Sequence, residues 1–421
     1  MGEARPVRFG HQISALAQKT LSWRQIVLTP MNSRIVSLQA ALRVAGLDGW
    51  LFFDHHRRDP LAYRILQFTP GSPVTRRWFY FVPAQGEPRG LAHKIEEHTL
   101  TELPGSAKTY TSWNSLVDGL RSLLGDAKRV AMQYSPNCAV PYVSLVDGGT
   151  LELVRGLGVD VASSADLVQL FEARWSAEQL EMHLEAARRV DLVRREAFAR
   201  IGEKLRGEGR VTEWEICEFI RQRFSAEGLL ADHGPDVAVN ANASNPHYEP
   251  TQADSSEIKP GDTVLIDLWA KLNRPSSVYY DICWVGFCGQ RPPQKYQNVF
   301  EIVRDARNLA VKRVVDGVAA RDDLRGYQVD DAARSHIRSH GFGEYFYHRT
   351  GHSIGEEVHG TGANMDNLET HDERKVIPWT CFSVEPGIYL PEFGIRCEVD
   401  VFVGEDGARV TGDIQDRLVL L

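Results

Sequence analysis

The sequence predicts an α+β protein of two domains, in which an α/β domain over residues 33–172 precedes a larger domain over residues 173–421. Two patterns indicate this organisation: helical and strand-like segments alternate from Ser33 to about residue 172, and charged strand pairs follow residue 240. The length of 421 residues suits two or three domains of roughly 150 residues each. A composition of 43% hydrophobic and 25% charged residues is typical of a globular protein with large cores.

Residues 1–32 are predicted to form an N-terminal extension. They carry several basic residues but no continuous apolar run of the kind that marks a secretory signal. A second methionine, Met31, opens the first clearly periodic segment. No apolar run in the chain approaches the roughly 18 residues that a membrane-spanning helix requires.

The first domain begins with an amphipathic helix. Residues 33–46, SRIVSLQAALRVAG, place apolar side chains at helical spacing and end on a glycine. Residues 49–54 and 78–83 are short apolar and aromatic runs, which predict buried strands. Residues 129–134 and the segment around 151–154 are interpreted as further strands of the same domain.

A long helix is predicted to join the two domains. Ser176 and Gln179 can form a capping box at its start, and apolar residues then recur at helical spacing. Gly207 and Gly209 end the helix, and a second helix is expected to begin near Thr212.

Charge and cysteine usage restrict the partners and the location. The net charge of -8, from 48 basic and 56 acidic residues, gives no basic surface for nucleic acid and no attraction to an anionic membrane. The six cysteines include no C-x-x-C pair, so we interpret them as reduced thiols of a cytoplasmic protein.

Two aspartates lie in apolar strands that are predicted to pair. Asp267 belongs to DTVLIDLWA and Asp281 to SVYYDICWVGF, with a turn-forming KLNRPSS segment between them. An antiparallel hairpin centred on residue 274 would place the two carboxylates directly opposite each other, about 5 Å apart. Facing carboxylates in apolar surroundings repel unless a proton or a cation lies between them. The alternative is that one aspartate is buried and the other lies at a solvated strand end.

A second pair of strands carries further carboxylates. CFSVEPGIYL contains Glu385, and FGIRCEVDVFV alternates between Arg396, Glu398 and Asp400 on one face and apolar residues on the other. An edge strand with one solvated face would give the same alternation.

The stretch HRTGHSIGEEVHG, residues 348–360, contains three histidines and two glutamates. It lacks the H-E-x-x-H order of zinc peptidase helices, and its glycines disfavour a regular helix, so alone it could be a metal site, an acid/base cluster or a polar loop. With the four carboxylates of the two strand pairs, however, one histidine completes a ligand set for two adjacent divalent ions. The excess of oxygen ligands argues against a structural zinc site.

These motifs resemble the pita-bread metallopeptidases, the group that contains methionine aminopeptidase, Xaa-Pro aminopeptidase and prolidase. The family order Asp, Asp, His, Glu, Glu is matched by Asp267, Asp281, His352, Glu385 and Glu398, within the words HRTGHSIGEEVHG, VEPGIY and RCEVD. The likeness covers about residues 175–421. Residues 33–172 resemble the creatinase-type N-terminal domain of the proline-directed branch, which methionine aminopeptidase usually lacks.

The resemblance implies an exopeptidase for Xaa-Pro bonds in short proline-containing peptides. It implies two divalent ions, most simply Mn, with Co or Zn as alternatives, and a homodimer. Glu385 would act as general base and then acid, and His359 would stabilise the scissile carbonyl oxygen. His247 would also take part in catalysis from the substrate side, and His247 and His348 would line the substrate cleft. Two alternatives stay open: an Xaa-Pro aminopeptidase acting on longer peptides, and a non-catalytic module that binds peptides or proteins.

The chain also departs from the family pattern. Cys283 and Trp284 occupy positions where the family has Thr and Arg, and GTGANMDN after His359 lacks the usual Glu and Arg. The Thr normally supports the metal-bound water. The missing Arg would leave the substrate carboxylate to Arg374 or Arg396.

Overall fold

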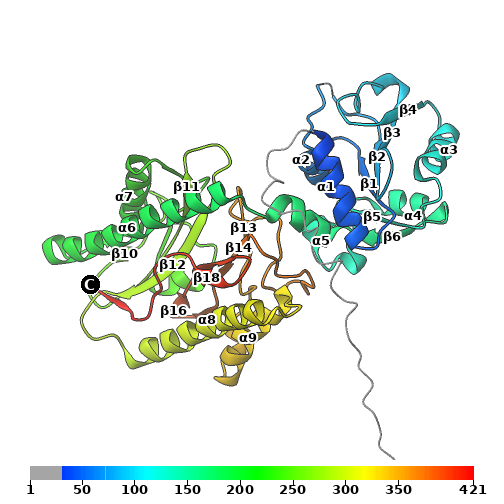
Figure 1. Cartoon of the computed structure of the whole chain (residues 1–421). Helices are drawn as coiled ribbons and strands as arrows, with labels where there is room; N and C mark the ends of the chain where they lie inside the picture. Colours follow the sequence, from blue (N-terminus) through cyan, green and yellow to red (C-terminus); the bar gives the residue numbers. More distant parts are fainter. Residues whose placement is uncertain (1–30, 72) are drawn as a thin grey trace, which may run out of the picture.

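Helices and strands alternate from residue 31 onward in the computed structural model, which describes residues 31–71 and 73–421. They form two lobes that meet near α5 (Ala165–Val168) and the start of α6 (Ala177–Glu208) (Figure 1). The expected extension over residues 1–32 lies outside the described residues, apart from the first two positions of α1 (Met31–Val44). The α+β class is confirmed, whereas the boundary between residues 172 and 173 stays a prediction.

The N-terminal lobe is built on a six-stranded mixed sheet with the order β4-β3-β2-β1-β5-β6. Its strands are β1 (Gly49–Asp54), β2 (Trp78–Pro83), β3 (Arg89–His93), β4 (Ser106–Tyr110), β5 (Arg129–Met132) and β6 (Asp160–Ser163). Both faces are covered, because Trp50 and Phe52 pack into one core while Leu51 and Phe53 pack into the other. Two buried faces explain why β1 and β2 are continuous apolar runs in the sequence.

The strands predicted at residues 49–54, 78–83 and 129–134 are confirmed, but the one predicted around residues 151–154 is wrong. This segment belongs to helix α4 (Gly148–Gly156), whose N-cap Asp147 accepts hydrogen bonds from the backbone N–H and the hydroxyl of Thr150. Leu151 and Val154 are buried on one side of that helix, three residues apart. The other helices of this lobe are α1, α2 (Pro60–Leu66) and α3 (Trp113–Leu124).

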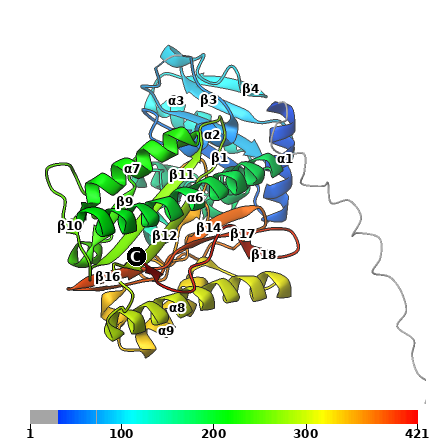
Figure 2. The same cartoon turned by 90° about the vertical axis from the view of Figure 1, so that its left-hand side faces the viewer.

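The C-terminal lobe places its strands between two pairs of helices. Helices α6 and α7 (Glu213–Ala226) cover one side, and α8 (Gln294–Ala320) and α9 (Gly326–Ser339) cover the other (Figure 2). The predicted capping box of Ser176 with Gln179 is present at the start of α6, and Thr212 caps α7 as expected. Gly209 ends α6 in a left-handed conformation, with φ of 76°.

Two sheets form the middle of this lobe. The first joins β8 (Leu229–Leu230), β9 (Asp236–Val239), β11 (Thr263–Leu272), β12 (Tyr280–Phe287) and β19 (Val419–Leu420). The second joins β13 (Ser353–Ile354), β14 (Thr380–Val384), β17 (Val399–Val403) and β18 (Ala408–Val410). Two further pairs are β7 (Val211–Thr212) with β10 (Glu257–Ile258), and β15 (Gly387–Leu390) with β16 (Phe393–Arg396).

The predicted hairpin of the two aspartates exists, but its register differs by one residue at the turn. β11 and β12 pair around residue 275, so that Asp267 lies opposite Cys283 and Asp281 lies opposite Trp269. The direct opposition of the two aspartates is therefore corrected. Because Asp281 and Cys283 are two residues apart on one strand, Asp267 and Asp281 still share a face as diagonal neighbours.

A buried ion pair fixes the histidine-rich segment to α9. Asp330, fully buried, accepts two hydrogen bonds from the Arg334 guanidinium at 2.7 and 2.8 Å. Arg334 also donates to the carbonyl oxygens of Phe346 and His348, and Asp330 accepts from the backbone N–H of Thr350 at 3.0 Å. The pair therefore holds the backbone on both sides of residue 349 in one position.

The described residues include no helix long and apolar enough to cross a membrane. All six cysteines lie in this part of the chain and none forms a disulfide; Cys138 is exposed and the other five are buried.

Asp330→Ala should lower the free energy of unfolding by about 3–5 kcal/mol, because it leaves the Arg334 guanidinium buried without its partner. Asp316→Ala is the matched control, since Asp316 forms an exposed pair with Lys312 on α8. It should change the stability by no more than about 0.5 kcal/mol. Urea denaturation followed by tryptophan fluorescence measures both, and equal losses in the two variants would contradict the anchoring role of Asp330.

Candidate metal centre

The second predicted strand pair is present, and both of its strands break at the predicted ligand positions. Glu385 lies between β14 and β15, and Glu398 lies between β16 and β17. At the break, the Glu385 N–H donates to the Thr350 carbonyl at 2.7 Å, and the Glu398 N–H donates to the Cys283 carbonyl at 3.1 Å. The interruption of the ladder therefore connects Glu385 to the histidine-rich segment and Glu398 to β12.

His352 lies against these carboxylates. Its Nε2 is 3.6 Å from Asp281 Oδ2 and 3.5 Å from Glu385 Oε1. Candidate ligand atoms of Asp281, His352 and Glu398 all lie within 4.8 Å of one another, and all three residues are buried. The Nδ1 of His352 is 3.2 Å from the Ser353 carbonyl, an arrangement in which Nδ1–H donates and Nε2 presents its lone pair to the carboxylates.

Asp236 is a further carboxylate at this site, and we did not predict it from the sequence. It lies directly opposite Asp267 in the β9–β11 pair. One buried guanidinium, that of Arg396, forms an ion pair with Asp267 and lies 3.9 Å from Glu385 Oε2. Five carboxylates lie near this guanidinium: Asp236, Asp267, Asp281, Glu385 and Glu398. When ionised together they exceed the nearby positive charge, so a buried site of this kind requires protons or cations.

The pKa values reflect this excess of negative charge. Burial, reinforced by Asp267, raises the pKa of Asp236 to about 8 and that of Asp281 well above its ordinary value. Burial and then Asp281 raise the pKa of Glu398 in the same way. Burial raises the pKa of Glu385 to about 7, against the opposing effect of Arg396 and Arg349. Without a cation, the cluster therefore favours protonated carboxyl groups.

The donor set fits two divalent ions. The candidate ligands are carboxylate oxygens and one imidazole, which suit ions such as Mn and Co as well as catalytic zinc. They come from Asp267, Asp281, His352, Glu385 and Glu398. Oδ1 of Asp267 is buried without a hydrogen-bond partner among the described residues, as expected for an atom that a cation would satisfy. Asp267 Oδ1 is therefore an atom to which a bound divalent ion could be coordinated.

Three other histidines surround the approach to the cluster. His359 contacts the His352 ring edge-on, with centroids 4.3 Å apart, and burial together with Arg349 lowers the pKa of His359 to about 4. His233 and the exposed His247 also lower it, so both lie near His359. His233 was missed from the sequence, where it is an isolated histidine followed by Gly234 and Pro235.

His348 is held beside the cluster by two hydrogen bonds. Its Nε2 is 2.7 Å from the Tyr389 hydroxyl, and its Nδ1 is 2.7 Å from the Arg349 carbonyl. Burial, and then Arg396, lower the pKa of His348 to about 3. Like His359, His348 is therefore neutral near pH 7.

Arg374 is placed differently from our expectation. Its side chain is buried, donates to the Asp372 carboxylate at 2.6 and 2.9 Å, and donates to the Thr361 carbonyl. A guanidinium already satisfied in this way does not offer its donors to a substrate carboxylate. Arg396 is likewise buried and paired with Asp267, so both predicted anchors already have partners within the protein.

Arg349 is the cation that we missed. It is only partly buried, its guanidinium donates to the Tyr142 hydroxyl, and it has no carboxylate ion-pair partner among the described residues. Its charge acts on His352, His359 and Glu385, which places it beside the cluster. The sequence offered a signal, because Arg349 lies within HRTGHSIGEEVHG itself.

Behind the cluster lies a second buried group, formed by His183, Cys381 and Asp400. Both ring nitrogens of His183 have partners at 2.7 Å, the Tyr279 carbonyl and the Thr411 hydroxyl. Asp400 accepts a hydrogen bond from the Asp281 backbone N–H at 2.9 Å. Asp400 therefore connects this group to the backbone of Asp281.

Comparisons with known proteins agree with this geometry. The model of metallopeptidase family M24 matches residues 181–405. The Xaa-Pro dipeptidase of Lactobacillus helveticus is 25% identical over 387 residues, which cover 90% of this chain and 93% of that protein. Dipeptidase PepE of Mycobacterium ulcerans superposes with a TM-score of 0.64 at 24% identity, covering 93% of this chain and 97% of that one.

A second solved structure is also similar. The X-prolyl aminopeptidase of Caenorhabditis elegans, a cytosolic enzyme with a di-nuclear active site, gives a TM-score of 0.63 at 16% identity. This match covers 93% of this chain and 63% of that one. At this identity the likeness concerns the fold, and with the family match it confirms the predicted pita-bread architecture.

Asp281→Ala should lower the amount of divalent metal that copurifies with the chain, because it removes one of three buried candidate ligands whose atoms all lie within 4.8 Å of one another. The exposed Asp316→Ala variant should keep the metal content of the unsubstituted chain. Elemental analysis by plasma mass spectrometry after exhaustive dialysis compares the two, and unchanged metal in Asp281→Ala would refute the ligand assignment.

Proposed function

Because this chain belongs to metallopeptidase family M24, we propose that it is a dinuclear exopeptidase that hydrolyses Xaa-Pro bonds in short peptides. The observation that carries the proposal is the arrangement of five carboxylates and His352 beside a group of neutral histidines. The relatives support it, since one is an Xaa-Pro dipeptidase and another has a di-nuclear active site.

In this proposal two divalent ions, with Mn preferred, would be held by Asp267, Asp281, His352, Glu385 and Glu398. When bound, such ions polarise the scissile carbonyl and lower the pKa of the attacking water from about 15.7 toward about 7. Glu385 would accept the proton of that water as general base and pass it to the leaving nitrogen as general acid. The Arg396 guanidinium restrains Asp267 while these charges change.

Three histidines beside the metal centre act on the substrate. His359, held against the His352 ring, donates a hydrogen bond to the carbonyl oxygen as negative charge develops there. His348 and His247 line the cleft. An Xaa-Pro bond offers no N–H and has a fixed φ, so attack on the carbonyl itself suits it better than a grip on the peptide backbone.

Arg349 is the group that we propose as the anchor for the substrate carboxylate. Its guanidinium is already held by a neutral partner, Tyr142 of the N-terminal lobe, and lacks an acidic one. A cation at this place that has no acidic partner among the described residues would favour dipeptides, whose carboxylate lies close to the scissile bond. An Xaa-Pro aminopeptidase is the second candidate, supported by the fold shared with the Caenorhabditis elegans enzyme. The complete ligand set disfavours a non-catalytic binding module.

Two further features belong to the proposal. A cytoplasmic location agrees with six cysteines that form no disulfide. A homodimer is proposed from the family resemblance alone.

A substrate panel tests the function directly. Xaa-Pro dipeptides and matched Xaa-Pro-Yaa tripeptides are assayed with added Mn, Co or Zn, and the metal bound per chain is measured on the same samples. We expect two ions per chain and faster hydrolysis of dipeptides. Faster hydrolysis of tripeptides would favour the aminopeptidase, and absence of both hydrolysis and stoichiometric metal would favour the binding module.

His359→Ala and His352→Ala should fail in different ways. His359→Ala should keep its metal but lose about 10²- to 10³-fold in kcat with a modest change in KM, because a transition-state donor is lost. His352→Ala should lose metal first, and added metal should partly restore its activity. Metal stoichiometry and steady-state kinetics are measured side by side. If His359→Ala loses metal as readily as His352→Ala, the separation of roles is wrong.

Arg349→Gln should raise KM for dipeptides by about tenfold or more, as expected for loss of a charge-assisted hydrogen bond worth about 1.5–3 kcal/mol. Tripeptides, whose carboxylate lies one residue further away, should be affected less. Tyr142→Phe removes only the hydroxyl that contacts Arg349 and should have a smaller effect. An equal loss on both substrate lengths would show that Arg349 does not bind the dipeptide carboxylate.

A further inference from the structure

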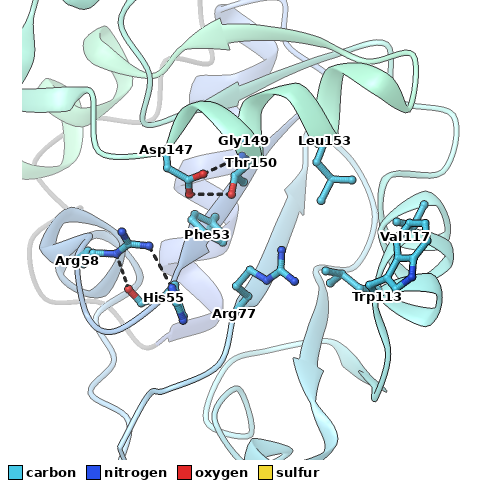
Figure 3. Close-up of a pocket in the computed structure, with 11 residues that line it drawn as sticks. Phe53, His55, Arg58, Arg77, Trp113, Val117, Asp147, Gly149, Thr150 and Leu153 are labelled. Carbon is cyan, nitrogen blue, oxygen red and sulfur yellow. Dashed lines mark hydrogen bonds between the residues drawn. The ribbon is translucent and has the colours of Figure 1, made fainter.

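A pocket of about 630 Å³ lies in the N-terminal lobe, built from elements that contribute nothing to the metal centre (Figure 3). Its volume falls in the range of about 300–1,000 Å³ that is usual for sites binding small molecules. Its walls include His55, Arg58, Arg77, Trp113 and Asp147, with Phe53 among its apolar residues. No step of the proposed peptidase reaction uses these residues.

The pocket lies where ligand sites form in α/β sheets. Phe53 and His55 lie at the carboxyl end of β1, which runs parallel to β5. Arg77 directly precedes β2, whose first residue pairs with Asp54 at the same end of β1. Trp113 begins α3 after β4, and Asp147 caps α4 after β5. Crevices outside the carboxyl ends of such strands are the usual place for a bound ligand.

The turn that presents His55 and Arg58 is strained and firmly held. His56 and Arg57 follow each other with φ of 63° and 56°, a conformation that non-glycine residues adopt at a cost of order 1–3 kcal/mol each. The buried Asp54 carboxylate maintains it by accepting hydrogen bonds from the N–H groups of Arg57 and Asp59 at 2.8 and 2.9 Å. Strain kept in place by a dedicated carboxylate is typical of a functional turn.

Positive charge predominates in the pocket. Neither Arg58 nor Arg77 forms an ion pair with a carboxylate among the described residues, and Arg58 donates only to the backbone carbonyl and ring of His55. The one acidic group, Asp147, already accepts two hydrogen bonds from Thr150. Two guanidinium groups that form no ion pair with a carboxylate of the described residues make a local site for an anion on a chain of net charge -8, although Arg58 also acts electrostatically on Asp147.

An aromatic wall accompanies the charge. Trp113 is 71% exposed at the start of α3 and lines the pocket together with Val117. Figure 3 shows Arg77 between the Arg58 and His55 side of the pocket and Trp113. An exposed indole and a guanidinium that line one pocket suit a planar ring that carries an acidic group, because the ring can stack on the indole while the acid binds the cation.

We propose that this pocket binds a small aromatic anion, with its acidic group on Arg77 and Arg58 and its ring against Trp113. The acidic group can be a carboxylate or a phosphate monoester, since a guanidinium recognises both through paired hydrogen bonds. The site is independent of the metal centre, so it does not depend on the proposed peptidase activity.

Isothermal titration calorimetry on the full chain tests the proposal with benzoate, phenyl phosphate and the uncharged benzyl alcohol. We expect saturable binding of at least one anion, weaker binding at higher salt, and at least about tenfold weaker binding of benzyl alcohol. Preference between benzoate and phenyl phosphate identifies the acidic group. Equal affinity for the anions and benzyl alcohol, or no saturable binding of any probe, would overturn the proposal.

Arg77→Gln should weaken binding of the anion by about tenfold or more. Arg76→Gln is the matched control, because Arg76 is the adjacent exposed arginine, contacts Thr75 and does not line the pocket. Trp113→Ser should weaken the aromatic anion more than inorganic phosphate, which lacks a ring. Equal weakening by Arg76→Gln and Arg77→Gln would reduce the effect to general surface charge. If Arg77→Gln dissociates an oligomer but still binds the anion probes as tightly as the unsubstituted chain does, this face is a subunit contact. That result would also overturn the proposed site.

Discussion

Electrostatic repulsion among buried carboxylates is the constraint on which the C-terminal lobe depends. Five acidic side chains from five segments of the chain meet beside the buried Arg396 guanidinium. Burial makes the charged form of each group costly, and the neighbours add to that cost. The fold tolerates this cluster only because rigid strands on every side hold it and because protons or cations can neutralise it. Without such neutralisation, this many acidic side chains would not be buried together in a stable protein.

Local irregularity in the backbone makes the cluster possible. Regular pairing along β14–β15 and β16–β17 would direct their amide groups to each other, but both strands break at Glu385 and Glu398. The freed amides bond to Thr350 and Cys283 instead, which ties three separate segments to one point. The Asp330–Arg334 pair then fixes the histidine segment from α9. Two sheets and one helix thus fix the positions of the side chains of the metal centre.

Much of this could be predicted from the sequence because the strongest signals are local. Apolar runs such as GWLFFD predicted strands correctly, and the capping box of Ser176 with Gln179 predicted where α6 begins. The strand predicted over residues 151–154 was wrong because a short apolar run fits a buried helix as well as a strand. The residue that starts the helix is its N-cap, Asp147. The hairpin register failed because the loop between β11 and β12 is not symmetric about residue 274, which only the pairing reveals. Asp236, His233 and Arg349 were missed because their importance arises from neighbours distant in the chain. Arg374 was misplaced for a different reason, since a partner only two residues away, Asp372, already satisfies its guanidinium.

The uneven exposure of the cysteines gives the protein a ready attachment point. Five thiols are enclosed, while Cys138 is exposed four residues before Tyr142, the side chain that reaches Arg349 across the two lobes. A maleimide dye would therefore react at one position on the native chain without any cysteine being removed. Placed there, the dye reports through its emission whether the lobes stay docked beside the histidine segment, and it can do so while substrate is being turned over.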